Sequence, residues 1–385
     1  MIAYNKEWLG HLIIRKDIEE VFDENCITKA EQKIINEKYD VPFYTPNIFI
    51  RIGLFILTII IMLFSFGLLS LLFLDAIGKM AGVLAIIFSI IGYLFLEYIV
   101  KAKKHYRSGM DEALLWGSAL AFFAGISLPN DLPGLVNCII IFILTLYSSL
   151  RFADRLMAVA MYISLLGILF YSCIESGGFA KAIVPFVMMA ASAMIYYFAG
   201  KLRCKKYALH YKGCLEMILI TSLCSFYVAG NYFVVRELSN SLFHMNLQAG
   251  QAIAYGWLFW IFTIIIPFTY ISRGIQRKDV VLLRVGLLLI AALVFTIRYY
   301  HTIMSVEMEM ALGGIILLLI NYGLMKYLHK PKHGFTYREI IKKNTLGKLN
   351  IESLVLAETF SPGIEVKGTE FGGGDFGGGG ASGEY

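Results

Sequence analysis

The sequence predicts an all-α polytopic transmembrane helical bundle of about ten spans. Hydrophobic residues make up 58% of the 385 residues, charged residues only 16%, and the mean hydropathy is +0.68. An ordinary soluble domain carries roughly 25% charged residues, so this chain has too few charges to cover a soluble surface of its size. The lipid bilayer is therefore the expected surrounding of most of the chain.

The apolar residues gather into ten runs, each close to the roughly 20 residues with which a helix crosses a bilayer. The runs cover residues 48–74, 79–100, 110–128, 132–150, 155–174, 180–200, 213–235, 249–272, 280–298 and 308–328. At the boundary between the third and fourth runs lie Pro129, Asn130, Asp131, Pro133 and Gly134. These residue types form turns, so we expect two helices joined by a tight turn there.

Lysine and arginine alternate between rich and poor loops, which predicts the direction of each span. The rich loops carry Lys101, Lys103, Lys104 and Arg107, then Arg151 and Arg155, then Lys201, Arg203, Lys205, Lys206 and Lys212, then Arg273, Arg277 and Lys278. The alternate loops carry only Lys79, Lys181, Arg236 and Arg298. Short loops rich in Lys and Arg stay cytoplasmic, so ten spans place both termini inside. Because the charges of the chain serve this orientation, we expect no nucleic-acid partner.

Residues 1–46 are expected to form a small cytosolic helical hairpin ahead of the bundle (47–328). Its second helix begins with a capping box, Thr28 to Glu31, and Ile34, Ile35 and Tyr39 would form the apolar face. Two interpretations stay open for this hairpin. It could be a lid that packs on the cytoplasmic face of the bundle, or a docking site for a partner.

The carboxyl-terminal part divides into a basic cytosolic linker (329–370) and a Gly/aromatic tail (371–385). Glycine has high chain entropy and no side chain to bury, so we expect the tail to be flexible. Phe371, Phe376 and Tyr385 are spaced along it. Such aromatic residues could bind pockets of a cytosolic or membrane protein partner, or the tail could be idle.

Two resemblances accompany these patterns. The stretch from Ile27 through Glu31 to Ile35, and the segment Glu112–Ile126, resemble an uncharacterised family of bacterial multi-pass membrane proteins with an amino-terminal cytosolic hairpin. The ending Phe376–Tyr385 is similar to the Gly-rich tails of bacterial TPM-domain membrane proteins, although no TPM domain fits in this chain. The resemblance implies a bacterial inner-membrane protein and supplies no catalytic residues.

Ionisable residues inside membrane spans are candidate functional groups, because burying their charge in lipid is costly. Glu97 lies four residues before Lys101, and Glu216 lies four residues after Lys212, so each is expected to form an interfacial ion pair. A further cluster, predicted to be periplasmic, contains Arg298, His301, Glu307 and Glu309. It would form either a substrate gate or part of an aromatic and ionic belt at the interface.

Polar residues within spans give a second set of candidates. Gln251 and Tyr255 would share one helix face, Asn321 lies inside the tenth run, and Pro185 and Pro267 could break their helices. Polar groups near broken helices are typical of transport sites, but they also form ordinary hydrogen bonds between helices.

No sequence motif indicates an enzyme. HExxH, GxSxG and P-loop patterns are absent, and the six cysteines and seven histidines show no metal-ligand spacing. We therefore expect no catalytic residues, no metal and no cofactor. The predicted function is a non-enzymatic scaffold or accessory protein that binds partners through its cytoplasmic ends. The alternative is a small-molecule transporter of the drug/metabolite type, with two halves of five helices.

Overall fold

The computed structural model describes residues 2–23, 26–72, 77–175, 178–243, 253 and 255–300, together with helical positions 308, 314–315, 318–319, 322–323 and 326. Every regular element in this part of the chain is a helix. The elements are α1 (Lys6–Asp23), α2 (Lys29–Lys38), α3 (Ile48–Leu72), α4 (Ile77–Ala102), α5 (Met110–Asn130), α6 (Gly134–Phe152), α7 (Arg155–Glu175), α8 (Gly178–Arg203), the 3₁₀ helix η2 (Lys206–Tyr211), α9 (Lys212–Gly230), α10 (Tyr232–Phe243), α11 (Gly256–Arg277) and α12 (Val280–Tyr300).

Helices α3–α9, α11 and α12 are long and apolar enough to cross a membrane, which makes nine candidate spans within the described residues. They match the first nine predicted runs. Most of the tenth run, 308–328, lies outside those residues. The expected all-helical, membrane-type architecture is thus confirmed, while the total of ten spans stays a prediction.

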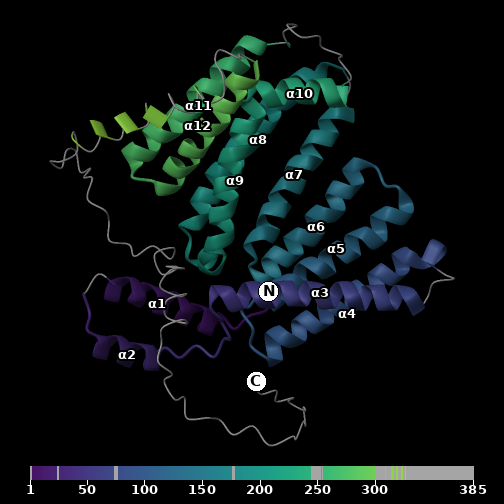
Figure 1. The fold of residues 1–385 in the computed structure, drawn as a ribbon, viewed down its shortest axis with the longest axis vertical. Helices are drawn as coiled ribbons and strands as arrows, with labels where there is room; N and C mark the ends of the chain where they lie inside the picture. The colour runs from purple at the N-terminus through teal and green to yellow at the C-terminus, as the bar shows by residue number, and fades with distance from the viewer. Residues whose placement is uncertain are drawn as a thin grey trace, which may run out of the picture.

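The long helices pack most closely as the pairs α4/α5, α6/α7, α8/α9 and α11/α12. These pairs spread out like a fan from the part of the molecule where α1 and α2 lie (Figure 1). In α4/α5, a Cβ atom at Gly82 would lie 2.6 Å from the Gly125 carbonyl oxygen, and one at Gly125 would lie 2.7 Å from that of Gly82. The two backbones therefore approach closely because neither residue has a side chain.

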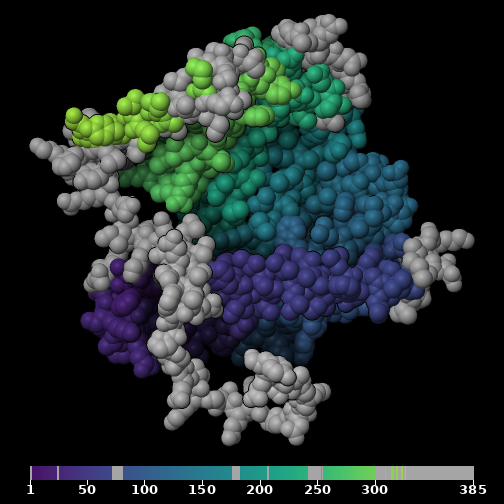
Figure 2. All heavy atoms as spheres, viewed as in Figure 1, coloured from purple at the N-terminus to yellow at the C-terminus, as the bar shows by residue number. Residues whose placement is uncertain are grey.

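Helix α3 packs mainly on α5 and is the least buried of the candidate spans. It forms a ridge on the face shown in Figure 2, and Ile52, Phe64 and Leu68 are all exposed along it. An apolar surface of this extent needs an apolar surrounding. The bilayer supplies such a surrounding, in agreement with the predicted lipid contact.

Antiparallel alternation brings the connections 103–109, 153–154, 204–211 and 278–279 to one end of the bundle, which we call the basic end. These connections and the adjoining helix ends contain the Lys- and Arg-rich loops of the sequence. Helix α1 lies at this end, where it contacts η2. The membrane side on which the basic end lies stays a prediction.

The structure differs from the predicted runs at two helix boundaries. The run 213–235 is divided at Asn231, whose extended backbone (φ −79°, ψ 128°) ends α9 and precedes α10. Helix α11 begins at Gly256, after Tyr255 in a left-handed conformation (φ 59°). The expectation that Tyr255 lies on a helix face is therefore wrong, and Gln251 lies outside the described residues. Pro185 and Pro267 are accommodated inside continuous helices.

Candidate functional site

The amino-terminal hairpin is joined to the basic end by backbone hydrogen bonds at both of its ends. The Ala3 amide donates to the Arg151 carbonyl (2.8 Å). The Tyr44 amide donates to the Lys104 carbonyl (3.0 Å), and the Tyr106 amide donates to the Tyr44 carbonyl (3.3 Å). One end of the hairpin is bonded to the last turn of α6 and the other to the loop before α5, so its position on the bundle is well defined. We call the contact region the junction.

Aromatic packing fills the apolar part of the junction. The buried ring of Tyr4 makes edge-to-face contacts with Phe43, Tyr106 and Phe152, with ring centroids 4.9–6.4 Å apart. These rings belong to one buried cluster with side chains of α1, α4, α5 and α7. Aromatic pairs in this geometry add stability beyond their buried area. The hairpin is thus a packed part of the bundle, which supports the lid interpretation.

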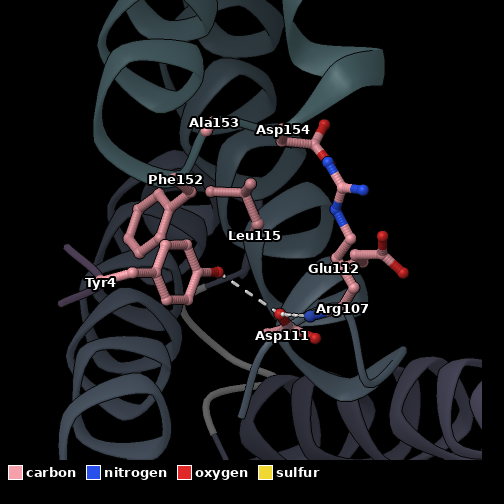
Figure 3. A pocket seen from close by; sticks show the side chains of 8 residues that line it. All are labelled: Tyr4, Arg107, Asp111, Glu112, Leu115, Phe152, Ala153 and Asp154. Carbon is pink, nitrogen blue, oxygen red and sulfur yellow. Dashed lines mark hydrogen bonds between the residues drawn. The ribbon is translucent and has the colours of Figure 1, made fainter. Parts of the chain in front are cut away.

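Asp111 is the buried carboxylate at the centre of the junction (Figure 3). It accepts hydrogen bonds from the backbone amides of Arg107 (2.8 Å) and Ser108 (2.9 Å) and from the Ser108 hydroxyl (3.0 Å). The Tyr4 hydroxyl lies 3.4 Å from its second oxygen and donates weakly to it. Burial, together with this negative charge, raises the pKa of Tyr4 well above its ordinary value. Tyr4 is therefore a neutral donor.

Asp154 belongs to the turn between α6 and α7 and lines the same small cavity as Asp111. One of its oxygens accepts the Met157 amide (2.7 Å) at the start of α7, and Figure 3 shows the Arg107 guanidinium directed toward it. Burial raises the pKa of Asp154, while the Met157 amide and the Arg107 charge act in the opposite direction. Arg107 therefore connects the loop before α5 to the turn before α7.

Two ion pairs tie neighbouring helices together next to the junction. Arg51 of α3 forms a bidentate pair with Glu112 of α5. Arg151 of α6 forms another with Glu97 of α4, at 2.9 and 3.0 Å. Bidentate pairing between a guanidinium and a carboxylate combines charge with fixed geometry. The ion pairs thus hold α3 to α5 and α4 to α6 at the basic end.

The loop before α5 needs glycine at position 109. Gly109 has φ +90°, which side chains rarely adopt, and a Cβ atom there would lie 2.1 Å from the Arg51 carbonyl oxygen. The loop can therefore approach α3 closely enough for Arg51 to reach Glu112.

The junction holds a cavity of only about 10 Å³, lined by Tyr4, Arg107, Asp111, Glu112, Leu115, Phe152, Ala153 and Asp154. A volume of that size has room for about one water molecule. The carboxylates around it already have donors or a neighbouring guanidinium. The junction is therefore a closely packed polar contact that holds the hairpin in place, and it has no room for a substrate.

The His105, Ser108 and Asp111 side chains form a chain of hydrogen bonds, with His105 Nδ1 2.8 Å from the Ser108 hydroxyl. In a Ser–His–Asp hydrolase the histidine lies between the other two residues and activates the serine. Here the serine lies in the middle, is fully buried and donates to Asp111. Burial also lowers the pKa of His105. This arrangement positions the loop and does not expose a nucleophile.

Of the two ion pairs predicted from the sequence, the structure contains one and replaces the other. Glu97 pairs with Lys101 at 2.8 Å, as predicted, but its stronger partner is Arg151, which sequence spacing did not indicate. Tyr93 also donates to Glu97 (2.8 Å) and contacts Tyr147 (2.7 Å). Glu216 pairs with Arg203 (3.1 Å) instead of the expected Lys212.

Of the predicted periplasmic cluster, Arg298 lies in the last turn of α12. The neighbouring Tyr299 and Tyr300 belong to an aromatic group with Tyr232, Phe233 and Trp260. This group favours the aromatic belt over a substrate gate. Several candidates lie outside the described residues, namely Gln251, His301, Glu307, Glu309, Asn321, Phe371, Phe376 and Tyr385.

Asn231 forms a buried polar cluster that the sequence reasoning missed. Its amide nitrogen donates to the hydroxyls of Tyr227 and Thr296, both at 3.0 Å. The adjoining Tyr232 amide donates to the Thr263 hydroxyl (2.9 Å), so the backbone group freed at the helix break is also bonded. An asparagine inside an apolar run is the signal that could have indicated this break. The cluster holds α9, α10, α11 and α12 together.

Comparison with known proteins assigns no family to this chain. No protein-family model matches it, and neither a curated protein nor a solved structure does. The two resemblances noted in its sequence therefore stay predictions. Within the described residues, no group of three or more His, Cys, Asp or Glu side chains is placed to hold a metal ion.

Proposed function

We propose that this protein is a non-enzymatic scaffold or accessory protein of the bacterial inner membrane that binds a partner through its cytoplasmic ends. One observation carries the proposal: the junction fixes the hairpin on the bundle but leaves α2 unburied. None of the ten residues of α2 is buried. A helix this short is marginal alone in water, so its ordered but exposed state is useful mainly as a surface for another molecule.

Helix α2 is held by its cap and by α1. The predicted capping box is present: the Glu31 amide donates to the Thr28 hydroxyl oxygen (3.3 Å), and the Thr28 amide donates to the Glu31 carboxylate (2.8 Å). Arg15 of α1 donates to the carbonyls of Asn36 (2.7 Å) and Tyr39 (2.8 Å). These contacts occupy the inner side and the ends of α2, and its outer side is left to a partner.

Ile34 marks this outer side. We expected Ile34 to share an apolar face with Ile35 and Tyr39, but it is 65% exposed while the other two are half-buried. Charged residues, Glu31 and Lys38, lie one turn away on either side of it. An apolar centre with a charged rim is the usual composition of a transient protein interface. The cytoplasmic location of this surface rests on the positive-inside rule.

The proposal is tested by quantitative affinity capture from native membranes. The unmodified full chain is compared with three variants. Ile34→Asp places a charge at the centre of the α2 surface, and deletion of 371–385 removes the aromatic tail. Val21→Asp is the matched control, because Val21 is an exposed apolar residue of the same hairpin, on α1. We expect Ile34→Asp to lower the recovery of a specific protein about tenfold, and Val21→Asp to leave it unchanged.

The two ends can be distinguished by the same experiment. A partner lost only on deletion of 371–385 would move the binding site from α2 to the tail. An identical set of captured proteins from all forms would contradict the proposal for both ends.

The transporter alternative is favoured by one observation, the helix break at Asn231, because broken helices form substrate sites in transporters. A transport site must meet water, whereas a packed cluster does not. We therefore suggest Asn231→Cys in a cysteine-free background, with the detergent-solubilised protein labelled by a water-soluble thiol reagent that reaches both sides. The scaffold proposal expects no labelling, with Val21→Cys as the labelled control. Rapid labelling of position 231 would favour transport.

A further inference from the structure

An open apolar groove runs between α7, α8 and α9, away from the junction. Its volume is about 360 Å³, which is in the range of small-ligand sites. Apolar side chains line most of its length, among them Leu165, Ile195, Phe198, Leu215 and Ile218. All three helices are candidate membrane spans, so the groove faces the hydrocarbon region.

Among the described residues, the interior wall of the groove offers no free polar group to a ligand. Tyr162 contributes to its wall, but its hydroxyl donates to the buried Ser192 hydroxyl (3.1 Å) and is therefore already used inside the protein. Ala199, one turn before the end of α8, also lines the groove, and its small side chain leaves space there. The part of an occupant that lies along this wall must therefore be a hydrocarbon.

Two lysines line the groove where it reaches the basic end. Lys201 lies in the last turn of α8, and Lys205 precedes η2. Both are exposed, and no carboxylate of the described residues lies within ion-pairing distance of either ammonium group. In the part of the chain that the structure describes, the ion pair near these lysines joins Arg203 and Glu216.

The sequence around these lysines is basic throughout. Residues 201–212 contain Lys201, Arg203, Lys205, Lys206 and Lys212 and no Asp or Glu. Among the described residues, the Lys201 and Lys205 charges at the mouth of the groove therefore have no carboxylate partner, whereas Arg203 is paired with Glu216. Basic pockets between membrane helices bind anionic lipid headgroups.

We infer that this groove binds an anionic phospholipid, with an acyl chain along the apolar wall and the headgroup phosphate between Lys201 and Lys205. An occupant of the groove must be apolar along the wall and negative at the basic end, and an anionic phospholipid of the surrounding bilayer meets both conditions. This binding site is separate from the α2 surface, so either proposal can fail without the other.

The test measures which lipids stay bound to the full-length protein. The protein is reconstituted in nanodiscs of equal parts phosphatidylglycerol and phosphatidylcholine, released, and analysed by native mass spectrometry. We expect bound phosphatidylglycerol to exceed phosphatidylcholine several-fold. Lys201→Gln with Lys205→Gln should lower that ratio about tenfold, because each lysine contributes to the attraction of anionic lipid.

Two further variants keep the result specific. Lys16→Gln with Lys103→Gln removes the same charge from exposed lysines outside the groove and should leave the ratio unchanged. Leu165→Trp fills the groove and should reduce the retention of phosphatidylglycerol while leaving both lysines in place.

Three outcomes would overturn the inference. Equal retention of the two lipids by the unmodified protein would show ordinary boundary lipid only. An equal loss in the Lys16 and Lys103 control would show a general charge effect. A groove occupied by a second protein chain, seen as a mass adduct lost with Leu165→Trp while lipid binding persists, would assign it to another partner.

Discussion

The Glu97 carboxylate receives both hydrogen bonds of a bidentate contact from Arg151, 54 residues later in the chain, at 2.9 and 3.0 Å. The same Arg151 offers its carbonyl oxygen to the Ala3 amide. One residue therefore links α4 to α6 with its side chain and holds the amino-terminal hairpin with its backbone. Its side-chain contacts should be essential for the stability of the basic end.

Arg151→Gln should destabilise the folded protein by about 2 kcal/mol, since a mostly buried carboxylate loses charged hydrogen bonds. An SDS titration in mixed micelles measures the free energy of unfolding. A double-mutant cycle with Glu97→Gln should show coupling of about 1–2 kcal/mol. The exposed pair Lys33–Glu37 (3.9 Å) is the control, with coupling below about 0.5 kcal/mol. Additive effects of the Glu97 and Arg151 changes would contradict this role.

Gly109→Ala should destabilise the protein by about 2–3 kcal/mol, because its backbone conformation is unfavourable for alanine. The new Cβ atom would also meet the Arg51 carbonyl oxygen. Gly10→Ala is the matched control: Gly10 lies inside α1, and a Cβ atom there would meet nothing within 4 Å. That change should be neutral or stabilise by up to about 1 kcal/mol. Similar unfolding free energies for the two variants would refute the close approach at Gly109.

Two substitutions of Tyr4 can separate the contribution of ring packing from that of hydrogen bonding at the junction. Tyr4→Ala should cost about 3 kcal/mol, since a buried aromatic ring is lost, and should accelerate hydrogen exchange throughout residues 2–23. Tyr4→Phe should cost less than about 1 kcal/mol, because Asp111 keeps its three other donors. If Tyr4→Phe released the hairpin as fully as Tyr4→Ala, the weak hydrogen bond would be the dominant contact instead.

Helix α2 should loosen in acid. Hydrogen bonds from the Thr28 backbone and side chain hold the pKa of Glu31 below its ordinary value of 4.5. The capping contribution is therefore fully present above pH 4.5 and is lost as the pH falls through the lower folded-state pKa. Amide exchange within α2, corrected for the intrinsic pH dependence, should rise over that interval.

Thr28→Ala should remove most of this acid dependence and should speed exchange in α2 roughly fivefold at neutral pH. Exchange in α1 provides the internal reference. An unchanged acid response in Thr28→Ala would mean that another group controls the stability of α2.

The helical architecture was predictable because apolar run length and Lys/Arg placement are local signals. The capping box at Thr28 and Glu31 was predictable for the same reason, as was the pairing of Glu97 with Lys101. The split at Asn231 was not predicted, because apolar residues continue on both sides of it and the single asparagine is a weak signal. What ends α9 there is a set of bonds to Thr296 and Tyr227, and Thr296 lies 65 residues away.

The junction could not be predicted from the sequence, for a related reason. Tyr4 and Asp111 are separated by 107 positions, and nothing in the periodicity of either segment indicates the other. From its position in the sequence alone, Asp111 is only a negative charge at the start of the apolar run 110–128, where the helix dipole favours it. The packing of α5, α6 and α7 determines which carboxylates are buried. It also determines which arginine lies next to them.

The docking of the hairpin has a consequence for the order of assembly during synthesis. Residues 2–23 are synthesised more than a hundred residues before their partners Arg151, Phe152 and the Asp154 turn. These residues of the nascent chain therefore cannot form their junction contacts until α6 has been synthesised and inserted. Closing the junction thus requires that the chain has been synthesised through the turn before α7.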